Sequence, residues 1–131
     1  MYREYLNKLV ENLEAMQIYG QNQTLCTDYE KAMQELVDLF SDIKKKEKQV
    51  FFIGNGGSAA IASHMTADFM KNGGMKTYSL YDNSVTTCMG NDYGYEYIFS
   101  RPLEFLGNTG DLLIAISSSG NSQNIVNAIQ V

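Results

Sequence analysis

The chain has 131 residues, of which 44% are hydrophobic and 19% charged, and this balance predicts one globular domain. Its net charge of −5 argues against nucleic acid as a direct ligand. No apolar run approaches the ~20 residues of a membrane span, and the charged N-terminus is not typical of a signal peptide. Cys26 and Cys88 lack a metal or redox spacing, so we expect reduced thiols in a cytoplasmic protein.

Two amphipathic helices are predicted at the start of the chain. The first covers residues 2–19, where apolar side chains recur on one stripe at helical spacing: Leu6, Leu9, Val10, Leu13 and Met16. The second is expected to begin near Thr27, which has the capping-box spacing to Glu30, and to continue to Ile43. We therefore expect residues 1–46 to form a helical pair.

From residue 49 onward, short apolar runs alternate with helical periodicity. Strands are predicted over residues 49–53, 76–80 and 111–116. Helices are predicted over residues 58–71, 84–89, 95–106 and 121–130, with Pro102 breaking or restarting the third. The alternation predicts βαβ units and a mostly parallel sheet, with residues 47–131 as the first part of an α/β core. Both faces of a parallel sheet need cover, so further elements are expected beyond Val131.

Two polar loops each follow a predicted strand and open a predicted helix. The glycines of the first loop let the backbone approach a ligand closely, and its serine adds a hydroxyl at the helix start: Gly54, Asn55, Gly56, Gly57 and Ser58. The second loop places four hydroxyls at a helix N-terminus, an arrangement that suits an anion: Ser117, Ser118, Ser119, Gly120, Asn121 and Ser122. Because ligands bind at the carboxyl ends of such strands, the two loops together predict a site for phosphate or a sugar phosphate.

Other interpretations of these loops remain open. Glycine-rich turns are common packing devices, and a serine cluster can serve only as a cap and a turn. Gly54, Gly56 and Ala59 also satisfy a weak dinucleotide fingerprint, for which Asp82 is a candidate ribose ligand. The serine-rich loop has no role in that scheme, so we expect no nucleotide cofactor.

Three segments resemble a known family. FFIGNGGSAA, GNDYGYEYIFSRPLEFLG and GDLLIAISSSGNSQN are similar to the SIS (sugar isomerase) domain proteins, and among them to the sedoheptulose 7-phosphate isomerases. The resemblance implies a SIS-type, flavodoxin-like parallel sheet flanked by helices, and a homotetramer assembled through the N-terminal helices. It implies isomerisation of sedoheptulose 7-phosphate to D-glycero-D-manno-heptose 7-phosphate in the biosynthesis of bacterial surface heptose.

The resemblance also assigns substrate-binding residues. Ser117, Ser119 and Ser122 match the serines that bind the phosphate, and Asn55 and Ser58 match residues that line the sugar site. In the family the active site is shared between subunits. The remaining expected substrate-binding residues are the other members of the two loops and one acidic residue close to the substrate: Gly56, Gly57, Ser118, Asn121 and Asp92.

A catalytic base and a zinc-binding pair are implied on the helix after the first loop. The family uses a glutamate four residues after a histidine, and the matching positions here are Asp68 and His64. Their i,i+4 spacing puts both side chains on one side of the helix, where they can serve zinc or simply form a surface pair. Asp68 is one methylene shorter than glutamate, and a base displaced by ~1 Å can lose ~10²-fold in rate.

The rest of the family's catalytic set has no counterpart in this sequence. The other zinc ligands are a glutamine and a histidine that acts as general acid, and they are expected beyond residue 131. His64 is the only histidine, so we expect the 131 residues alone to lack the general acid. The alternative function is a non-catalytic SIS regulatory module that binds a sugar phosphate or a replication initiator protein.

Overall fold

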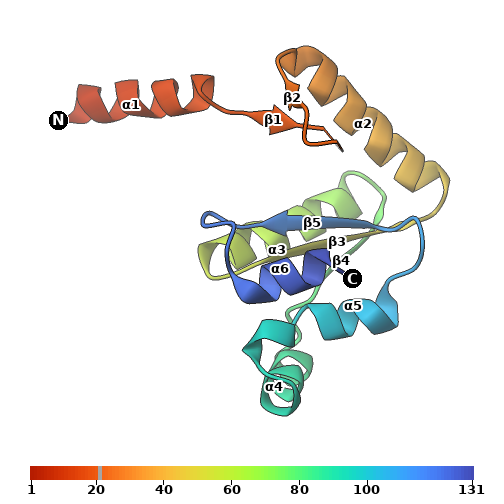
Figure 1. Cartoon of the computed structure of the whole chain (residues 1–131). Helices are drawn as coiled ribbons and strands as arrows, with labels where there is room; N and C mark the ends of the chain where they lie inside the picture. The colour runs from red at the N-terminus through yellow and green to blue at the C-terminus, as the bar shows by residue number, and fades with distance from the viewer. Residues whose placement is uncertain (21) are drawn as a thin grey trace. The chain divides into compact units, whose positions relative to one another are not determined.

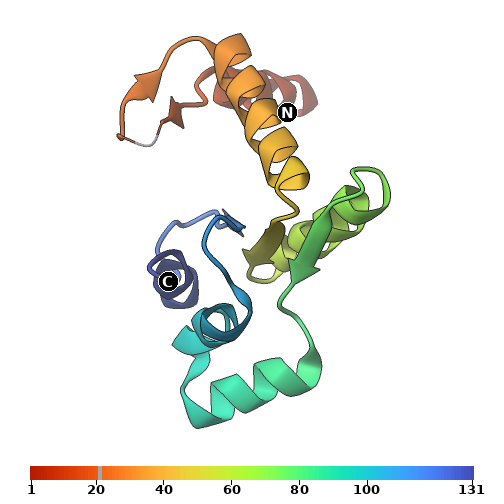
Figure 2. The same ribbon diagram turned by 90° about the vertical axis from the view of Figure 1, so that its right-hand side faces the viewer.

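The structure, a computed structural model, describes residues 1–20 and 22–131. The chain divides into two compact units, residues 1–40 and residues 41–131. The first contains a helix, a small hairpin and most of a second helix, and the second contains a parallel sheet with its helices (Figure 1 and Figure 2). Every candidate site residue belongs to the second unit.

The first unit opens with helix α1, Tyr2–Glu14. The helix predicted over residues 2–19 is therefore too long, because its last part forms a strand. Strand β1, Ile18–Tyr19, pairs antiparallel with strand β2, Leu25–Cys26. The turn between them is closed by a bond from the Gly20 amide to the Thr24 carbonyl at 3.0 Å. Isoleucine and tyrosine favour strands. Beyond Glu14 only Met16 continues the apolar stripe, so the strand pairing outweighs the helical pattern there.

Helix α2, Tyr29–Lys45, starts from a different cap than the spacing of Thr27 and Glu30 predicts. The carboxylate of Asp28 accepts from the Lys31 amide at 3.0 Å, and the Asp28 carbonyl accepts from the Ala32 amide. A carboxylate satisfies an amide at a helix start as well as a hydroxyl does, so the adjacent aspartate takes this role. The predicted capping box is wrong by one residue.

Helix α1 buries none of its side chains within the chain. The predicted apolar stripe is present on its surface, and its members are exposed: Leu6, Leu9, Val10, Leu13 and, just beyond the helix, Met16. An amphipathic helix usually covers such a stripe by packing against another element. The stripe is a surface that this chain by itself leaves in contact with solvent.

A parallel three-stranded sheet forms the centre of the second unit, as the alternating pattern predicts. Its strands are β3, Gln49–Gly54, β4, Lys76–Ser79, and β5, Leu112–Ile116, in the order β4-β3-β5. The central strand β3 is buried from its second residue onward, as expected where both faces of a strand are covered.

Helices cover the two faces of β3. Helix α3, Gly57–Lys71, packs on one face, where the rings of Phe52 and Phe69 lie 5.3 Å apart. The other face carries the hydrophobic core together with helices α5, Ser100–Leu106, and α6, Gln123–Ile129. That core consists of eight buried residues: Phe51, Ile53, Leu80, Ile98, Phe99, Leu103, Ile125 and Ala128.

The segment between β4 and β5 differs from the helices predicted there. Helix α4 is longer than expected and spans Asn83–Asp92. The helix predicted over residues 95–106, with a break or restart at Pro102, is instead a 3-10 turn, Tyr95–Tyr97, followed by α5, so the interruption comes before Pro102. Pro102 lies in the first turn of α5. The N–H groups of a first turn have no acceptor within the helix, so a proline there breaks no helical hydrogen bond. Among the described residues, no helix is long and apolar enough to cross a membrane.

Gly54, the last residue of β3, allows the strand to turn tightly into α3. A Cβ atom at this position would lie 2.7 Å from the backbone carbon and oxygen of Ser58. Such a distance is too short for a real contact, so a side chain would force the first turn of α3 away from the strand. The glycine therefore sets how closely the first loop packs on the sheet.

We predict that Gly54→Ala lowers the free energy of unfolding by about 1–3 kcal/mol, the usual cost of overpacking. Gly57→Ala is the matched control, because a Cβ there meets nothing within 4 Å, and it should change stability by less than about 0.5 kcal/mol. Urea unfolding followed by circular dichroism measures both. Equal losses in the two variants would contradict the close approach at Gly54.

Candidate functional site

The register of the sheet brings the two predicted loops to the same edge. Gly54 of β3 pairs with Ile116 of β5, so Asn55 and Ser117 follow at the same level of neighbouring strands. Both loops lie at the carboxyl end of the sheet and lead into α3 and α6 (Figure 1). This is the edge at which open α/β sheets bind ligands.

In the first loop, the backbone begins α3 without a side-chain cap. Gly56 is the N-cap residue and has a φ of 54°, a left-handed conformation that glycine adopts without strain. The Ser58 amide donates to the Asn55 carbonyl at 2.9 Å, which closes the turn. The first amides of a helix have no helical acceptor, so this loop presents N–H groups and the positive end of a 15-residue helix.

Asn55 is held by two side chains that come from other elements. Its amide and that of Asn124 on α6 exchange two hydrogen bonds, Nδ2 of each to Oδ1 of the other, both at 2.9 Å. The hydroxyl of Tyr95 donates to the same Oδ1 of Asn55 at 3.2 Å. Asn124 is only 2% exposed. The first loop is therefore connected by side chains to the helix that follows the serine loop.

The serine loop is organised by its own hydroxyls. Ser117 Oγ accepts from the Gly120 amide at 3.1 Å, and Ser119 Oγ accepts from the Asn121 amide at 3.3 Å. Each hydroxyl that accepts in this way still has its O–H to donate. Ser118 and Asn121 are exposed, and Ser122 is the N-cap residue of α6 with no side-chain cap bond. The loop can offer O–H and N–H donors to an anion.

His64 and Asp68 form a pair on α3. His64 Nε2 lies 3.3 Å from Asp68 Oδ2, and the two side chains are 76% and 44% exposed. Asn72, one turn further, donates to Asp68 Oδ1 at 3.4 Å. At 1.5 Å per residue, Asp68 lies roughly 15 Å along the helix from Ser58. Within one chain, this pair therefore lies well down α3 from the two loops.

The side chains of this pair suit zinc, but they provide only part of a site. Imidazole nitrogen and carboxylate oxygen are common zinc ligands, and structural or catalytic zinc takes at least three from the protein. In residues 1–20 and 22–131, no group of three or more His, Cys, Asp or Glu side chains lies close enough to hold a metal ion. His64 and Asp68 can occupy two positions of a zinc site.

Asp92 is the last residue of α4, and its carboxylate accepts from Asn91 Nδ2 at 2.8 Å. The Cys88 thiol donates to the other oxygen of Asp92 at 3.5 Å. This hydrogen bond, with the negative charge of Asp92, raises the pKa of Cys88, so the thiol is the favoured form. Neither cysteine forms a disulfide. A nucleophilic thiolate is not favoured at this position.

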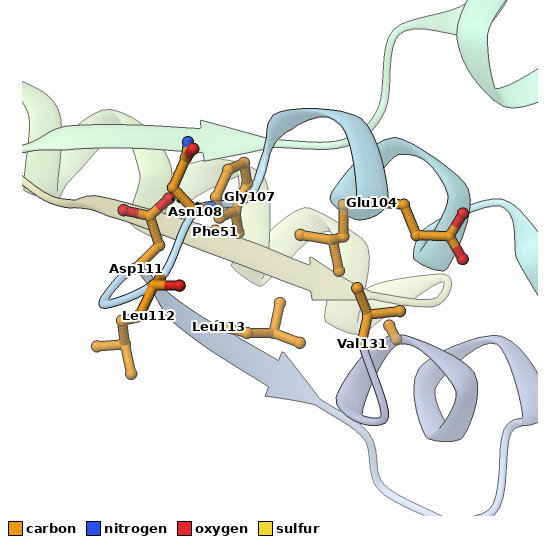
Figure 3. Close-up of a pocket in the computed structure, with 11 residues that line it drawn as sticks. Phe51, Glu104, Gly107, Asn108, Asp111, Leu112, Leu113 and Val131 are labelled. Atoms are coloured by element: carbon orange, nitrogen blue, oxygen red, sulfur yellow. Dashed lines mark hydrogen bonds between the residues drawn. The ribbon is translucent and has the colours of Figure 1, made fainter.

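One pocket of the second unit lies away from the two loops. A pocket of about 520 Å³ lies at the amino end of β5, between this strand, α5 and α6. Figure 3 shows Phe51, Leu113 and Val131 around it. None of the residues of the two loops lines the pocket, so it is not the predicted sugar-phosphate site.

Comparison with known proteins identifies the family. Residues 4–131 match the SIS domain family. The phosphoheptose isomerase of Campylobacter concisus is 40% identical over an alignment 133 positions long, which covers 95% of this chain and 68% of that protein. The corresponding enzyme of Akkermansia muciniphila is 41% identical over 105 residues, which cover 76% of this chain and 56% of that protein.

The chain belongs to the SIS domain family.

A solved structure supports the same assignment. The phosphoheptose isomerase GmhA from Neisseria gonorrhoeae superposes with a TM-score of 0.66 at 29% identity, covering 98% of this chain and 67% of that one. The SIS-type α/β fold expected from the resemblance is therefore confirmed. The chain spans between 56% and 68% of the length of the two relatives named above.

The alternative dinucleotide interpretation finds no support in the position of Asp82. Its carboxylate is the N-cap of α4 and accepts from the Val85 amide at 3.0 Å. One oxygen of this carboxylate therefore has a local role at the start of α4. The fingerprint at Gly54, Gly56 and Ala59 reflects the tight strand-to-helix turn of a SIS domain.

Three residues at this edge of the sheet were not predicted as part of the site. Asn124 and Tyr95 hold Asn55, and Tyr81 donates to the Gly54 carbonyl at 2.8 Å. One signal for Asn124 was available, since it falls on the same helical face as the apolar Ile125 and Ala128. A polar residue on a buried stripe indicates a buried hydrogen bond.

Burial raises the pKa of Tyr81 to about 12, and the nearby Tyr95 hydroxyl adds to this effect. The Tyr81 ring also packs edge-on against Phe99 at 5.8 Å. The folded state therefore favours the neutral phenol, which can donate to the first loop.

We predict a stability loss in alkaline solution that depends on Tyr81. Because its folded pKa of about 12 exceeds the ordinary value of 10.0, its contribution is complete below pH 10 and disappears as the pH rises through 12. In Tyr81→Phe, the free energy of unfolding should fall less steeply across this window than in the unmodified chain. Tyr78→Phe, at an exposed tyrosine on β4, is the control and should keep the original slope.

Proposed function

We propose that this chain carries the substrate-binding loops and the base-bearing helix of a phosphoheptose isomerase. The reaction converts sedoheptulose 7-phosphate to D-glycero-D-manno-heptose 7-phosphate in bacterial surface heptose and polysaccharide biosynthesis. The observation that carries the proposal is the serine loop beside the Asn55 loop at one sheet edge. The similarity to proteins named phosphoheptose isomerase supports the choice of sugar.

The phosphate would bind to the serine loop through neutral donors. The loop of residues 117–122 contains no lysine or arginine, and the hydroxyls of Ser117 and Ser119 have O–H groups to donate. Backbone amides at the start of α6 add further donors to a bound anion. The sugar would then extend toward Asn55 and Ser58 on the neighbouring strand end.

The reaction needs a base that moves a proton between adjacent carbons of the sugar. Asp68 is the candidate, and His64 at 3.3 Å and Asn72 at 3.4 Å orient its carboxylate. His64 and Asp68 are also the residues of this chain that would hold zinc. A bound zinc ion supplies Lewis-acid polarisation of a carbonyl oxygen.

Two features support an active site shared between copies of the chain. Asp68 lies roughly 15 Å along α3 from the first loop. A sugar phosphate bound at the loops of one chain would therefore be reached more easily by Asp68 of a second copy than by Asp68 of the same chain. The exposed apolar stripe of α1 is a surface that association would bury. We propose a homotetramer assembled through the N-terminal helices, located in the cytoplasm.

We predict that Ser119→Ala weakens binding of sedoheptulose 7-phosphate about tenfold while the fold is retained. The change removes one hydroxyl donor to a charged phosphate, for which a loss of this order is usual. Isothermal calorimetry measures the affinity, and Ser84→Ala, at an exposed serine on α4, is the control. Unchanged affinity in Ser119→Ala would remove the serine loop from the phosphate site.

We predict that a protein containing these residues together with the general acid that they lack isomerises sedoheptulose 7-phosphate, and that Asp68→Ala in that protein abolishes turnover, with assays run with and without added zinc. Asp68→Glu should retain or raise the rate, because a misplaced base can cost ~10²-fold and glutamate has the family's reach. Binding of the sugar phosphate without turnover in any of these proteins would favour the alternative function, a SIS regulatory module that binds a sugar phosphate or a replication initiator protein.

A further inference from the structure

A buried amide pair joins the two loops of the site. Asn124 comes two residues after Ser122, at the start of α6, and is 2% exposed. Its amide forms both hydrogen bonds of the pair with Asn55, although the two residues are 69 positions apart in the chain. The pair is the side-chain link between the loop that follows β3 and the helix that follows β5.

The hydrogen bonds of Asn55 determine what this residue can offer to a ligand. A side-chain amide has two acceptor sites on its oxygen and two N–H donors. Oδ1 of Asn55 accepts from Asn124 and from Tyr95, which uses both acceptor sites. One N–H donates to Asn124, so a single N–H remains. In this arrangement Asn55 is a donor toward a ligand and no longer an acceptor.

The burial of Asn124 suggests that orientation, and not packing, is its role. Its neighbours on the same face of α6 are the buried Ile125 and Ala128, so an apolar side chain would suit the position. A buried amide costs free energy unless its polar atoms are paired, and the pairing here is with Asn55. The amide pair, together with the hydrogen bond from Tyr95, fixes the plane of the Asn55 side chain.

We propose that Asn124 is a positioning residue for the sugar, acting through Asn55. It holds the Asn55 amide so that its remaining N–H donates to an oxygen of the sugar, while the phosphate is bound separately by the serine loop. Tyr95 is the second positioning residue and acts by occupying the other acceptor site of Asn55 Oδ1. The inference rests on the proposed function, because it assigns the partner of Asn55 within that sugar-phosphate site.

The test compares two ligands in matched variants. Sedoheptulose 7-phosphate reports on both parts of the site, whereas inorganic phosphate reports on the serine loop alone. Asn124→Leu removes the amide without adding charge, and Tyr95→Phe removes one hydroxyl from an exposed ring. Asn108→Leu is the control, since Asn108 is exposed and lies before β5, at the opposite end of the strand from the serine loop. Affinities are measured by NMR titration, which also resolves the side-chain amide signals of Asn55.

In Asn124→Leu we expect the affinity for sedoheptulose 7-phosphate to fall about tenfold and that for inorganic phosphate to stay within about twofold. The two Asn55 amide signals should move together toward the values of a solvent-exposed amide. Tyr95→Phe should weaken sugar-phosphate binding by about threefold, and it leaves the buried amide of Asn124 paired with Asn55. Asn108→Leu should match the unmodified chain for both ligands.

Other results would overturn the inference in distinguishable ways. If the unmodified chain binds the sugar phosphate and both Asn124→Leu and Tyr95→Phe bind it equally well, neither residue positions Asn55. If the variants lose affinity for both ligands in parallel, their role is structural. If the unmodified chain binds inorganic phosphate but gains nothing from the sugar, the proposed function itself fails, and the assignment of a sugar partner to Asn55 fails with it.

Discussion

The structure of the second unit depends on the parallel pairing of β3 with its neighbours. This strand is central and buried, and its register with β5 brings Gly54 level with Ile116. A shift of one residue would turn Phe51 and Ile53 away from the core that they share with α5 and α6. The same register determines that the two polar loops emerge side by side, so core packing and the geometry of the site have one cause.

Much of this unit follows from local sequence patterns. Strands β3 and β5 are short apolar runs, of which the first ends at Gly54 and the second is followed by Ser117. Helices predicted after the strands on periodicity begin and end near the expected residues. The two loops were recognisable because glycine and serine at a strand-to-helix junction have specific uses. These patterns involve residues only a few positions apart, so they can be recognised within a single segment of the sequence.

What the sequence did not predict depends on partners far along the chain or on competing local choices. The hairpin of Ile18–Tyr19 with Leu25–Cys26 forms because pairing across a turn outweighs a helical pattern. Asp28 replaces Thr27 as a cap because the two side chains can do the same task. Asn124 contacts Asn55 across 69 positions, and no periodicity relates two residues whose elements meet only in the folded sheet.

The serine loop has a consequence for the ionic conditions under which a phosphate would be held. Its donors are hydroxyls and backbone amides, without a lysine or arginine in residues 117–122. Salt at 0.1 M screens the attraction between full charges that lie more than about 10 Å apart, but it acts weakly on short hydrogen bonds from neutral donors. Retention of an anion by this loop should vary little with ionic strength, and discrimination among anions should depend on their shape.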